Sequence, residues 1–253
     1  MKAVDMEIIK SRQNEYIKMV KKLSQGKYRK ETGLCYVEGE KCVQEALMYS
    51  DVETILYTEK ADVEKLSGYG CRKLCISEEL MEYLSDAKTP QPVSCVTRMR
   101  PVDIDVSGKG ILIFLEDVQD PQNIGAIIRT ADAIGALGVI MSEKCADYTS
   151  SRAIRSSMGS CFHMPLLRTS DLMMEVEKVR KDGFSVLAAH LKGKEVFAPS
   201  DRTAILIGNE SKGLSDQLSE KADILVKIPM KGKAESLNAA VAAGVLMYRV
   251  FWK

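Results

Sequence analysis

The second half of the chain alternates short apolar runs with amphipathic segments. The runs are almost continuously apolar, as expected of strands in a parallel sheet that helices cover on both faces. They span residues 111–115, 139–141, 186–189, 205–207 and 224–228. Apolar residues at helical spacing predict helices over residues 123–135, 171–181, 215–221 and 237–251. This order predicts an α/β domain with a mainly parallel sheet.

The first half has shorter elements. Strands are predicted over residues 34–37, 54–57, 73–76 and 93–96. Helices are predicted over residues 40–49 and 77–85, the second with Ser77 as its N-cap. A stretch containing Pro101, Ser107 and Gly108 follows, which is typical of a linker. The sequence therefore predicts a smaller α/β domain at 1–98, a linker at 99–107 and a larger domain at 108–253.

Composition narrows the class of protein without naming a partner. The 253 residues have a net charge of +1, so contact with nucleic acid would depend on local clusters of charge. The seven cysteines form no CxxC pair and the chain has two histidines, which argues against a zinc site. No apolar run is long enough to span a bilayer, and no signal peptide is evident. These features predict a cytoplasmic protein without a metal or a membrane partner.

A glycine-bounded turn after the run at 205–207 is the first candidate site. It reads Gly208-Asn209-Glu210-Ser211-Lys212-Gly213-Leu214-Ser215. Open α/β sheets bind ligands at such turns, beyond the carboxyl ends of their strands. The glycine spacing matches a P-loop, but Leu214 stands where that motif needs lysine. We expect Gly208 to admit a ligand and the Asn-Glu pair to offer it polar groups; the alternative is a plain turn before a helix capped by Ser215.

A second candidate follows the strand that ends at Leu115. Asp120-Pro121 breaks that strand, and Asn123 can cap the next helix. Arg129 lies off the apolar stripe of this helix, where it could serve a site or simply pair with Asp132.

A third candidate is the segment 228–238, which precedes the last helix. It ends in Ser236-Leu237-Asn238, and Ser236 or Asn238 could cap that helix. The helix is small and apolar almost all round, which predicts burial or close packing on a partner.

Together and in this order, the three candidates resemble the SpoU (TrmH) family of RNA ribose 2′-O-methyltransferases, in the SPOUT superfamily. The matching residues are Asp120 to Gly125 with Arg129, Gly208 to Glu210 with Gly213 and Leu214, and Ile228 to Met230 with Gly232 and Ser236 to Asn238. The first half is similar, more loosely, to that family's L30e-like substrate-binding domain. The residues behind this match are Asn14, Ile17, Lys18, Arg29 and Val37 to Gly39.

The resemblance implies a trefoil-knotted catalytic domain that binds S-adenosylmethionine and works as a homodimer on RNA. It implies catalytic roles for Asn123, Arg129, Glu210, Ser236 and Asn238. It places the cofactor beside Ala188, Gly208, Asn209, Gly213, Ile228, Met230 and Leu237. Within this scheme we expect Arg129 to stabilise a developing alkoxide, because a guanidinium holds its proton too tightly to act readily as a base.

Basic residues near the N-terminus could supply an RNA-binding surface. Lys18, Lys22, Lys27 and Arg29 have few acids between them. Such a run is more often a solvated face, but beside a domain that resembles a ribosomal protein it predicts RNA docking. Arg152 and Arg155 are expected to add phosphate contacts from the second half of the chain.

The sequence therefore predicts S-adenosylmethionine-dependent methylation of a ribose 2′-hydroxyl in RNA. Large-subunit ribosomal RNA is favoured, because the family's short transfer-RNA enzymes lack the N-terminal domain. A transfer-RNA enzyme and a non-catalytic RNA-binding protein with the same fold are the alternatives. A dinucleotide-dependent enzyme is disfavoured, because no G-x-G-x-x-G turn follows Leu115.

Overall fold

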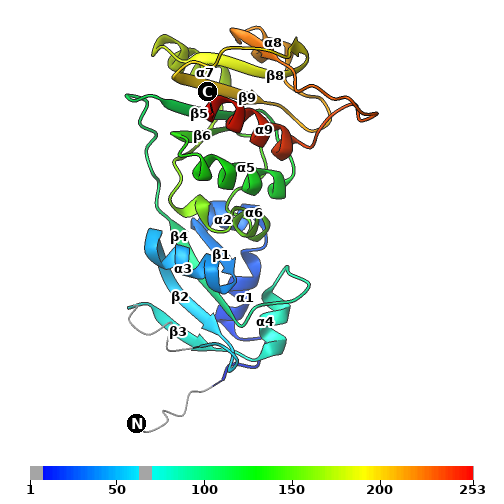
Figure 1. Ribbon diagram of the computed structural model, residues 1–253. Helices are drawn as coiled ribbons and strands as arrows, with labels where there is room; N and C mark the ends of the chain where they lie inside the picture. The colour runs from blue at the N-terminus through cyan, green and yellow to red at the C-terminus, as the bar shows by residue number, and fades with distance from the viewer. Residues whose placement is uncertain (1–7, 63–69, 253) are drawn as a thin grey trace. The chain divides into compact units, whose positions relative to one another are not determined.

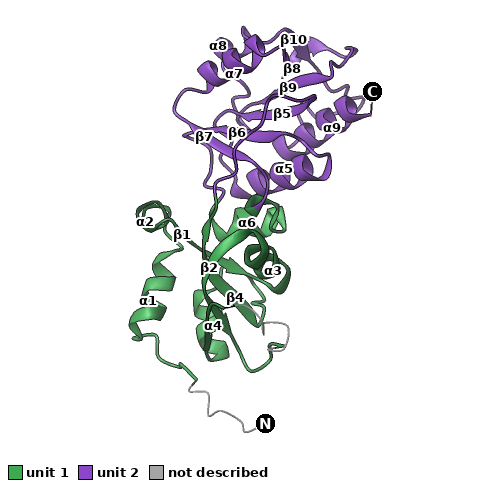
Figure 2. Ribbon diagram, turned by 90° about the vertical axis from the view of Figure 1, so that its left-hand side faces the viewer, with its two compact units in different colours: residues 1–100, 149–162 green, residues 101–148, 163–253 purple. Residues whose placement is uncertain are grey.

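The computed structural model describes residues 8–62 and 70–252. The chain folds into two compact units (Figure 1, Figure 2). Unit 1 holds residues 1–100 and 149–162, and unit 2 holds residues 101–148 and 163–253. Residues 100–109, between the last strand of unit 1 and the first strand of unit 2, contain no helix or strand. The units differ from the predicted ranges 1–98 and 108–253 chiefly in the segment 149–162, which groups with unit 1.

Over its described residues, unit 1 contains a four-stranded mixed sheet. Strand β4 runs antiparallel to both of its neighbours, β1 and β2, and the edge strand β3 runs parallel to β2. In sheet order the strands are β1 (Leu34–Glu38), β4 (Val93–Met99), β2 (Ser50–Tyr57) and β3 (Arg72–Cys75). All four predicted strands of the first half are confirmed, and β2 and β4 are longer than predicted.

Helices pack on this sheet and complete the core of unit 1. Asn14 caps the first helix and Ser77 caps the fourth, the latter as predicted. Ile17, Leu56 and Leu80 are fully buried together in the core. The helices are α1 (Glu15–Lys22), α2 (Gly26–Thr32), α3 (Glu40–Tyr49), α4 (Glu78–Leu84), α6 (Ser151–Ser157) and the 3-10 turn Ser160–Phe162.

The described residues of unit 2 form a six-stranded sheet in which every neighbouring pair is parallel. This confirms the predicted parallel α/β architecture. In sheet order the strands are β10 (Ile224–Val226), β8 (Ser185–Lys194), β9 (Arg202–Ile207), β5 (Gly110–Leu115), β6 (Gly138–Ser142) and β7 (Leu166–Thr169). The trefoil knot that the resemblance implies stays a prediction.

Helices cover both faces of this sheet, which explains why its strands are continuously apolar (Figure 2). Helices α7 (Leu172–Lys181) and α8 (Asp216–Ser219) pack on the face that includes the buried Phe114 and Leu206. Helices α5 (Pro121–Ala133) and α9 (Ala239–Phe251) lie against each other on the opposite face.

The helix caps of unit 2 lie beside the predicted motifs. Asp120 caps α5 by accepting a hydrogen bond from the Gln122 amide, so the prediction that Asn123 caps this helix is wrong. Pro121, with its preset φ, starts the helix earlier than the amphipathic pattern indicated. Asn238 caps α9 and Ser215 caps α8, as predicted.

Candidate active site

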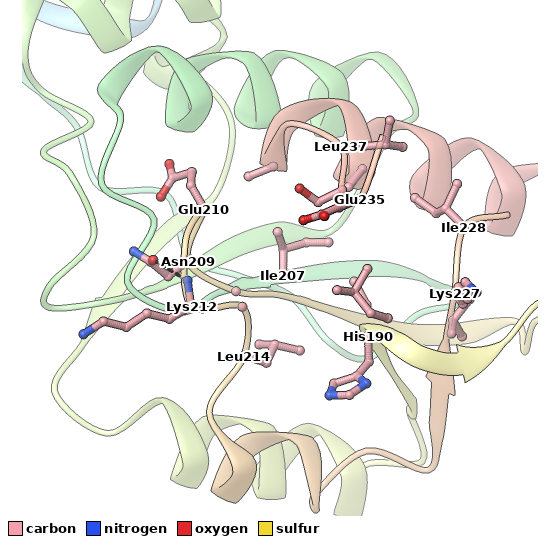
Figure 3. A pocket seen from close by; sticks show the side chains of 18 of the residues that line it. His190, Ile207, Asn209, Glu210, Lys212, Leu214, Lys227, Ile228, Glu235 and Leu237 are labelled. Atoms are coloured by element: carbon pink, nitrogen blue, oxygen red, sulfur yellow. Dashed lines mark hydrogen bonds between the residues drawn. The ribbon is translucent and has the colours of Figure 1, made fainter. Parts of the chain in front are cut away.

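A cavity of about 490 Å³ opens where three segments of unit 2 meet, a size typical of small-molecule sites (Figure 3). The first segment is the far end of β8, the second is the turn after β9, and the third runs from the end of β10 into α9. Six of the seven residues predicted to bind the cofactor line it: Gly208, Asn209, Gly213, Ile228, Met230 and Leu237.

Ala188 is the exception among these residues. Its side chain is fully buried within β8, which hydrogen-bonds to β9 and β10 on its two sides. The strand continues to Lys194, so no loop follows Ala188. The cavity wall on this strand is formed instead by residues 189–192. Ala188 therefore does not line the cavity, and we correct this prediction: residues 189–192 stand in its place.

The glycines of the turn are needed for the fold of the turn itself. A Cβ added at Gly208 would lie 2.2 Å from the backbone of Gly213 and of Leu214. Asn209 and Gly213 pair across the turn through two backbone hydrogen bonds, and Gly213 has a φ of +71°. Gly208 lines the cavity, and glycine is also required there because the chain folds tightly back on itself; its contact with a ligand stays a prediction.

The Asn209 side chain forms hydrogen bonds both within this turn and to a neighbouring loop. Its amide oxygen accepts hydrogen bonds from the backbone N–H groups of Ser211 and Lys212. Its amide nitrogen donates to the Asp117 carbonyl oxygen at 2.8 Å, in the loop after β5. Asn209 therefore lines the cavity and also ties two loops of unit 2 together.

Glu210 makes a second tie between the same loops. Its carboxylate accepts hydrogen bonds from the Asn123 amide at 2.9 Å and from the backbone N–H groups of Gln119 and Asp120. Partial burial raises the pKa of Glu210, but these hydrogen bonds to the charged form lower it more, and the net pKa is below the ordinary value. Glu210 is thus held as a carboxylate.

Asn123 connects this carboxylate to the last helix. Its Nδ2 donates to Glu210, while its Oδ1 accepts a hydrogen bond from Asn238 at 2.9 Å. Asn123 is 7% exposed, and the Asn238 oxygen is used in capping α9. A hydrogen-bonded chain of three predicted catalytic residues, Asn238–Asn123–Glu210, therefore joins α9, α5 and the turn after β9.

The other two predicted catalytic residues lie outside this chain. Ser236 lines the cavity at the approach to α9. Arg129 is exposed on α5, and within the described residues it makes no hydrogen bond or ion pair. The alternative pairing of Arg129 with Asp132 is wrong, because the Asp132 carboxylate lies 3.1 Å from His163 Nε2. The catalytic role predicted for Arg129 stays a prediction.

Several residues that hold the site together were not expected from the sequence. Glu116 accepts hydrogen bonds from the backbone N–H and the hydroxyl of Ser215, which links the end of β5 to the cap of α8. Asp117 adopts a φ of 55°, which is uncommon for a residue other than glycine. The side chain of Gln119 donates to the Asp117 carbonyl oxygen. No local sequence signal marks the contact of Glu116 with Ser215, since the two residues lie far apart along the chain.

Comparisons with known proteins decide the family. The model of the SpoU rRNA methylase family matches residues 110–248, and that of the MRM3-like substrate binding domain matches residues 14–95. The chain belongs to the SpoU rRNA methylase family. It is 34% identical to the 23S rRNA (guanosine(2553)-2′-O)-methyltransferase RlmP of Bacillus subtilis, over 97% of this chain and 99% of that protein.

Solved structures of SpoU relatives match the whole fold. An AdoMet-bound rRNA methyltransferase from Sinorhizobium meliloti is 31% identical with a TM-score of 0.83, over 97% of both chains. The SpoU methyltransferase AviRb from Streptomyces viridochromogenes, in complex with AdoMet, is 30% identical with a TM-score of 0.85, over 95% of this chain and 98% of that one. The predicted family, the RNA methyltransferase class and S-adenosylmethionine as cofactor are thereby confirmed.

The cavity of this SpoU protein suits such a cofactor. Ile207, Leu214, Ile228 and Leu237 offer apolar surface to an adenine ring, and the turn after β9 offers backbone groups and side chains that form hydrogen bonds. Over residues 8–62 and 70–252, no cluster of three or more His, Cys, Asp or Glu residues is arranged to hold a metal ion. In that same part of the chain, no helix is both long and apolar enough to cross a bilayer.

The residues predicted to bind RNA fall into two groups in unit 1. Lys18, Lys22, Lys27 and Arg152 are exposed or half-exposed, although Lys18 and Lys27 each have a carboxylate partner, Glu15 and Glu31. Lys22 lies over the ring of Tyr28.

Arg29 and Arg155 form the second group, and their charges are used inside unit 1. Arg29 is 8% exposed and donates to the carbonyl oxygens of Leu23 and Ser24 and to the Thr149 hydroxyl. We therefore correct its predicted role to a structural one. Arg155 is half-buried and pairs with the buried Glu38 carboxylate at 2.9 Å, which neutralises it.

Proposed function

We propose that this SpoU protein methylates the 2′-hydroxyl of one ribose in large-subunit ribosomal RNA. The observation behind the proposal is the hydrogen-bonded chain Asn238–Asn123–Glu210, which meets the cavity at Glu210 and joins α9, α5 and the turn after β9. The RlmP relative matches almost the full length of the chain and is named for guanosine 2553 of 23S rRNA, so the equivalent nucleotide is the first to examine.

The reaction divides between the cofactor and the residues of the chain. When bound, S-adenosylmethionine supplies a methyl group on a good leaving group, so alignment with the ribose oxygen provides most of the rate. Asn123, Ser236 and Asn238 orient the ribose and the neighbouring groups, while Glu210 keeps the loops in place. Arg129 stabilises the negative charge that develops on the 2′-oxygen and binds the adjacent phosphate.

We propose a homodimer as the working form. Helix α9 exposes large apolar side chains, including Val241, Val245 and Phe251, which a monomer would leave in water. The small residues Ala239 and Ala243 of the same helix are buried within the subunit, so the apolar side chains just named are the ones left for a partner. A second subunit would give Arg129, whose side chain is unpaired among the described residues, a place beside the neighbouring cofactor site.

Unit 1 is proposed to select the RNA. Its match to a substrate-binding domain favours ribosomal RNA over transfer RNA. The exposed cations Lys18, Lys22, Lys27 and Arg152 would neutralise phosphates. Such a substrate places the protein in the cytoplasm. A non-catalytic role is disfavoured, because the catalytic set Asn123, Arg129, Glu210, Ser236 and Asn238 is intact.

Mapping of 2′-O-methyl groups tests this proposal. Ribosomal RNA from cells with and without the protein is hydrolysed by alkali, which a 2′-O-methyl group blocks at its own nucleotide. We expect one large-subunit position to lose its protection when the protein is absent and to regain it with the wild type but not with Arg129→Ala. Unchanged ribosomal RNA alongside a lost transfer-RNA site would favour the transfer-RNA alternative.

A further inference from the structure

Two carboxylates line the described cavity, and they differ in how they are used. Glu210 accepts three hydrogen bonds from the protein, as described above. Within the described residues, Glu235 makes no hydrogen bond and no ion pair. Figure 3 shows its side chain pointing into the cavity from the segment before α9, close to Ile207 and Leu237. The charge of Glu235 is therefore free to act on whatever occupies the cavity.

Glu235 is exposed to solvent, and two apolar residues of the cavity lie beside it. Ile207 and Leu237 are apolar, and apolar neighbours reduce the screening of a charge compared with bulk water. The cationic or titratable groups that line the cavity are His190, Lys192, Lys212 and Lys227. In Figure 3, Lys212 extends away from the cavity, and Lys227 and His190 lie apart from Glu235. The charge of Glu235 is thus not neutralised by an ion pair within the described residues, and the lysines of the lining lie elsewhere on the cavity wall or extend from it.

The cofactor and its product differ by one charge. S-adenosylmethionine has a sulfonium cation, whereas the demethylated product has a neutral thioether; both keep the same α-ammonium and carboxylate groups. A fixed carboxylate near the sulfur therefore attracts the cofactor and has little effect on the product. This difference is lost as the methyl group leaves, because the charge on sulfur disappears in the reaction.

We propose that Glu235 is a specificity-determining residue that favours the charged cofactor over its neutral product. Its carboxylate faces the sulfonium, so it draws S-adenosylmethionine into the cavity and adds little to the binding of the neutral product. The proposal rests on the use of this cofactor by the family. Because the attraction acts on the ground state and fades in the transition state, loss of Glu235 raises KM for the cofactor and does not lower kcat.

Calorimetric titration of the full-length protein with S-adenosylmethionine and with S-adenosylhomocysteine tests the inference. The Kd values of the two ligands are compared at low and high salt for four proteins. These are the wild type, Glu235→Gln, Glu235→Asp and a matched control, Glu220→Gln. Glu220 is an exposed carboxylate outside the cavity lining. We expect Glu235→Gln to weaken binding of the cofactor about tenfold and that of the product less than twofold. Glu235→Asp should restore most of the ratio, and salt should narrow it.

Two results would overturn the inference. An equal loss for both ligands would show that Glu235 acts on the shared ammonium group or on the shape of the cavity. Unchanged binding of both would show that it does not face the ligand at all. If the folded wild type bound neither ligand, the cofactor site itself would be refuted, and this outcome is distinct because it does not depend on the variant. Circular dichroism confirms that each variant is folded.

Discussion

The hydrogen-bonded chain at the site can be broken at its centre by Asn123→Ala. Asn123 is buried on the inner side of α5, and it contacts Glu210 through its amide nitrogen and Asn238 through its amide oxygen. Alanine leaves the helix intact and removes both contacts. The neighbouring change Gln122→Ala is the matched control, because Gln122 is exposed on the same helical turn and no hydrogen bond is formed by its side chain among the described residues.

The cost follows from the two hydrogen bonds. A hydrogen bond to a charged group contributes about 1.5–3 kcal/mol and one between neutral groups about 0.5–1.5 kcal/mol. The better helix propensity of alanine offsets about 0.5 kcal/mol of this lost stability. Because Glu210 is partly open to water, the lower half of this range applies. We expect Asn123→Ala to destabilise unit 2 by about 2 kcal/mol, against less than about 0.5 kcal/mol for Gln122→Ala.

Urea unfolding measures this difference. Trp252 is the single tryptophan of the chain and stacks on Tyr248 at the end of α9, so its fluorescence reports on unit 2. Circular dichroism follows both units. Equal midpoints for Asn123→Ala and Gln122→Ala would refute the claim that these three side chains hold the site together.

Five further changes separate the roles assigned above. Arg129→Lys should keep cofactor affinity within about twofold but lower methyl transfer at least about tenfold, since lysine lacks the planar donor pair; full activity would exclude that role. Gly208→Ala should abolish cofactor binding, because the added Cβ meets backbone at 2.2 Å. Glu210→Gln should destabilise unit 2 at neutral pH. Because folding lowers the pKa of Glu210, its carboxylate adds its full share of stability above the ordinary pKa of 4.5. This stability is lost as the pH falls through the lower pKa of the folded protein, so the wild type and Glu210→Gln should become equally stable in acid. Arg29→Ala should destabilise unit 1 by about 2 kcal/mol, whereas Lys22→Ala should weaken RNA binding and leave the unfolding midpoint unchanged; the opposite pattern would contradict the division of the basic residues.

The strands of the parallel sheet could be predicted because burial on both faces leaves a continuous apolar run. Helix α3 was predicted at its observed bounds, Glu40–Tyr49. The exposed edge strand β7, Leu166–Thr169, was missed, since only one of its neighbours is a strand and its side chains are half-exposed. Helix α6 was also missed, because it is short and its apolar residues pack on the part of unit 1 that lies more than a hundred positions earlier in the chain.

The site was predictable where glycine and proline restrict the backbone, and less so where distant side chains meet. The turn at Gly208 and the cap at Asn238 follow from local rules. The contact of Arg29 with Thr149 and the bond between Asn123 and Asn238 join residues far apart in the sequence, so no local pattern reveals them. Basic residues in particular look alike in a sequence, whether they face solvent or fill a core.

The most direct measurement of the central claim is methyl transfer by the purified full-length protein. The enzyme is incubated with a large-subunit ribosomal RNA transcript and S-adenosylmethionine tritiated on its methyl group, and the RNA is digested to nucleosides. The account predicts that the label elutes as a single 2′-O-methyl nucleoside and that Arg129→Ala does not transfer it. Label on a base, or no transfer by folded protein that binds the cofactor and the RNA, would contradict it.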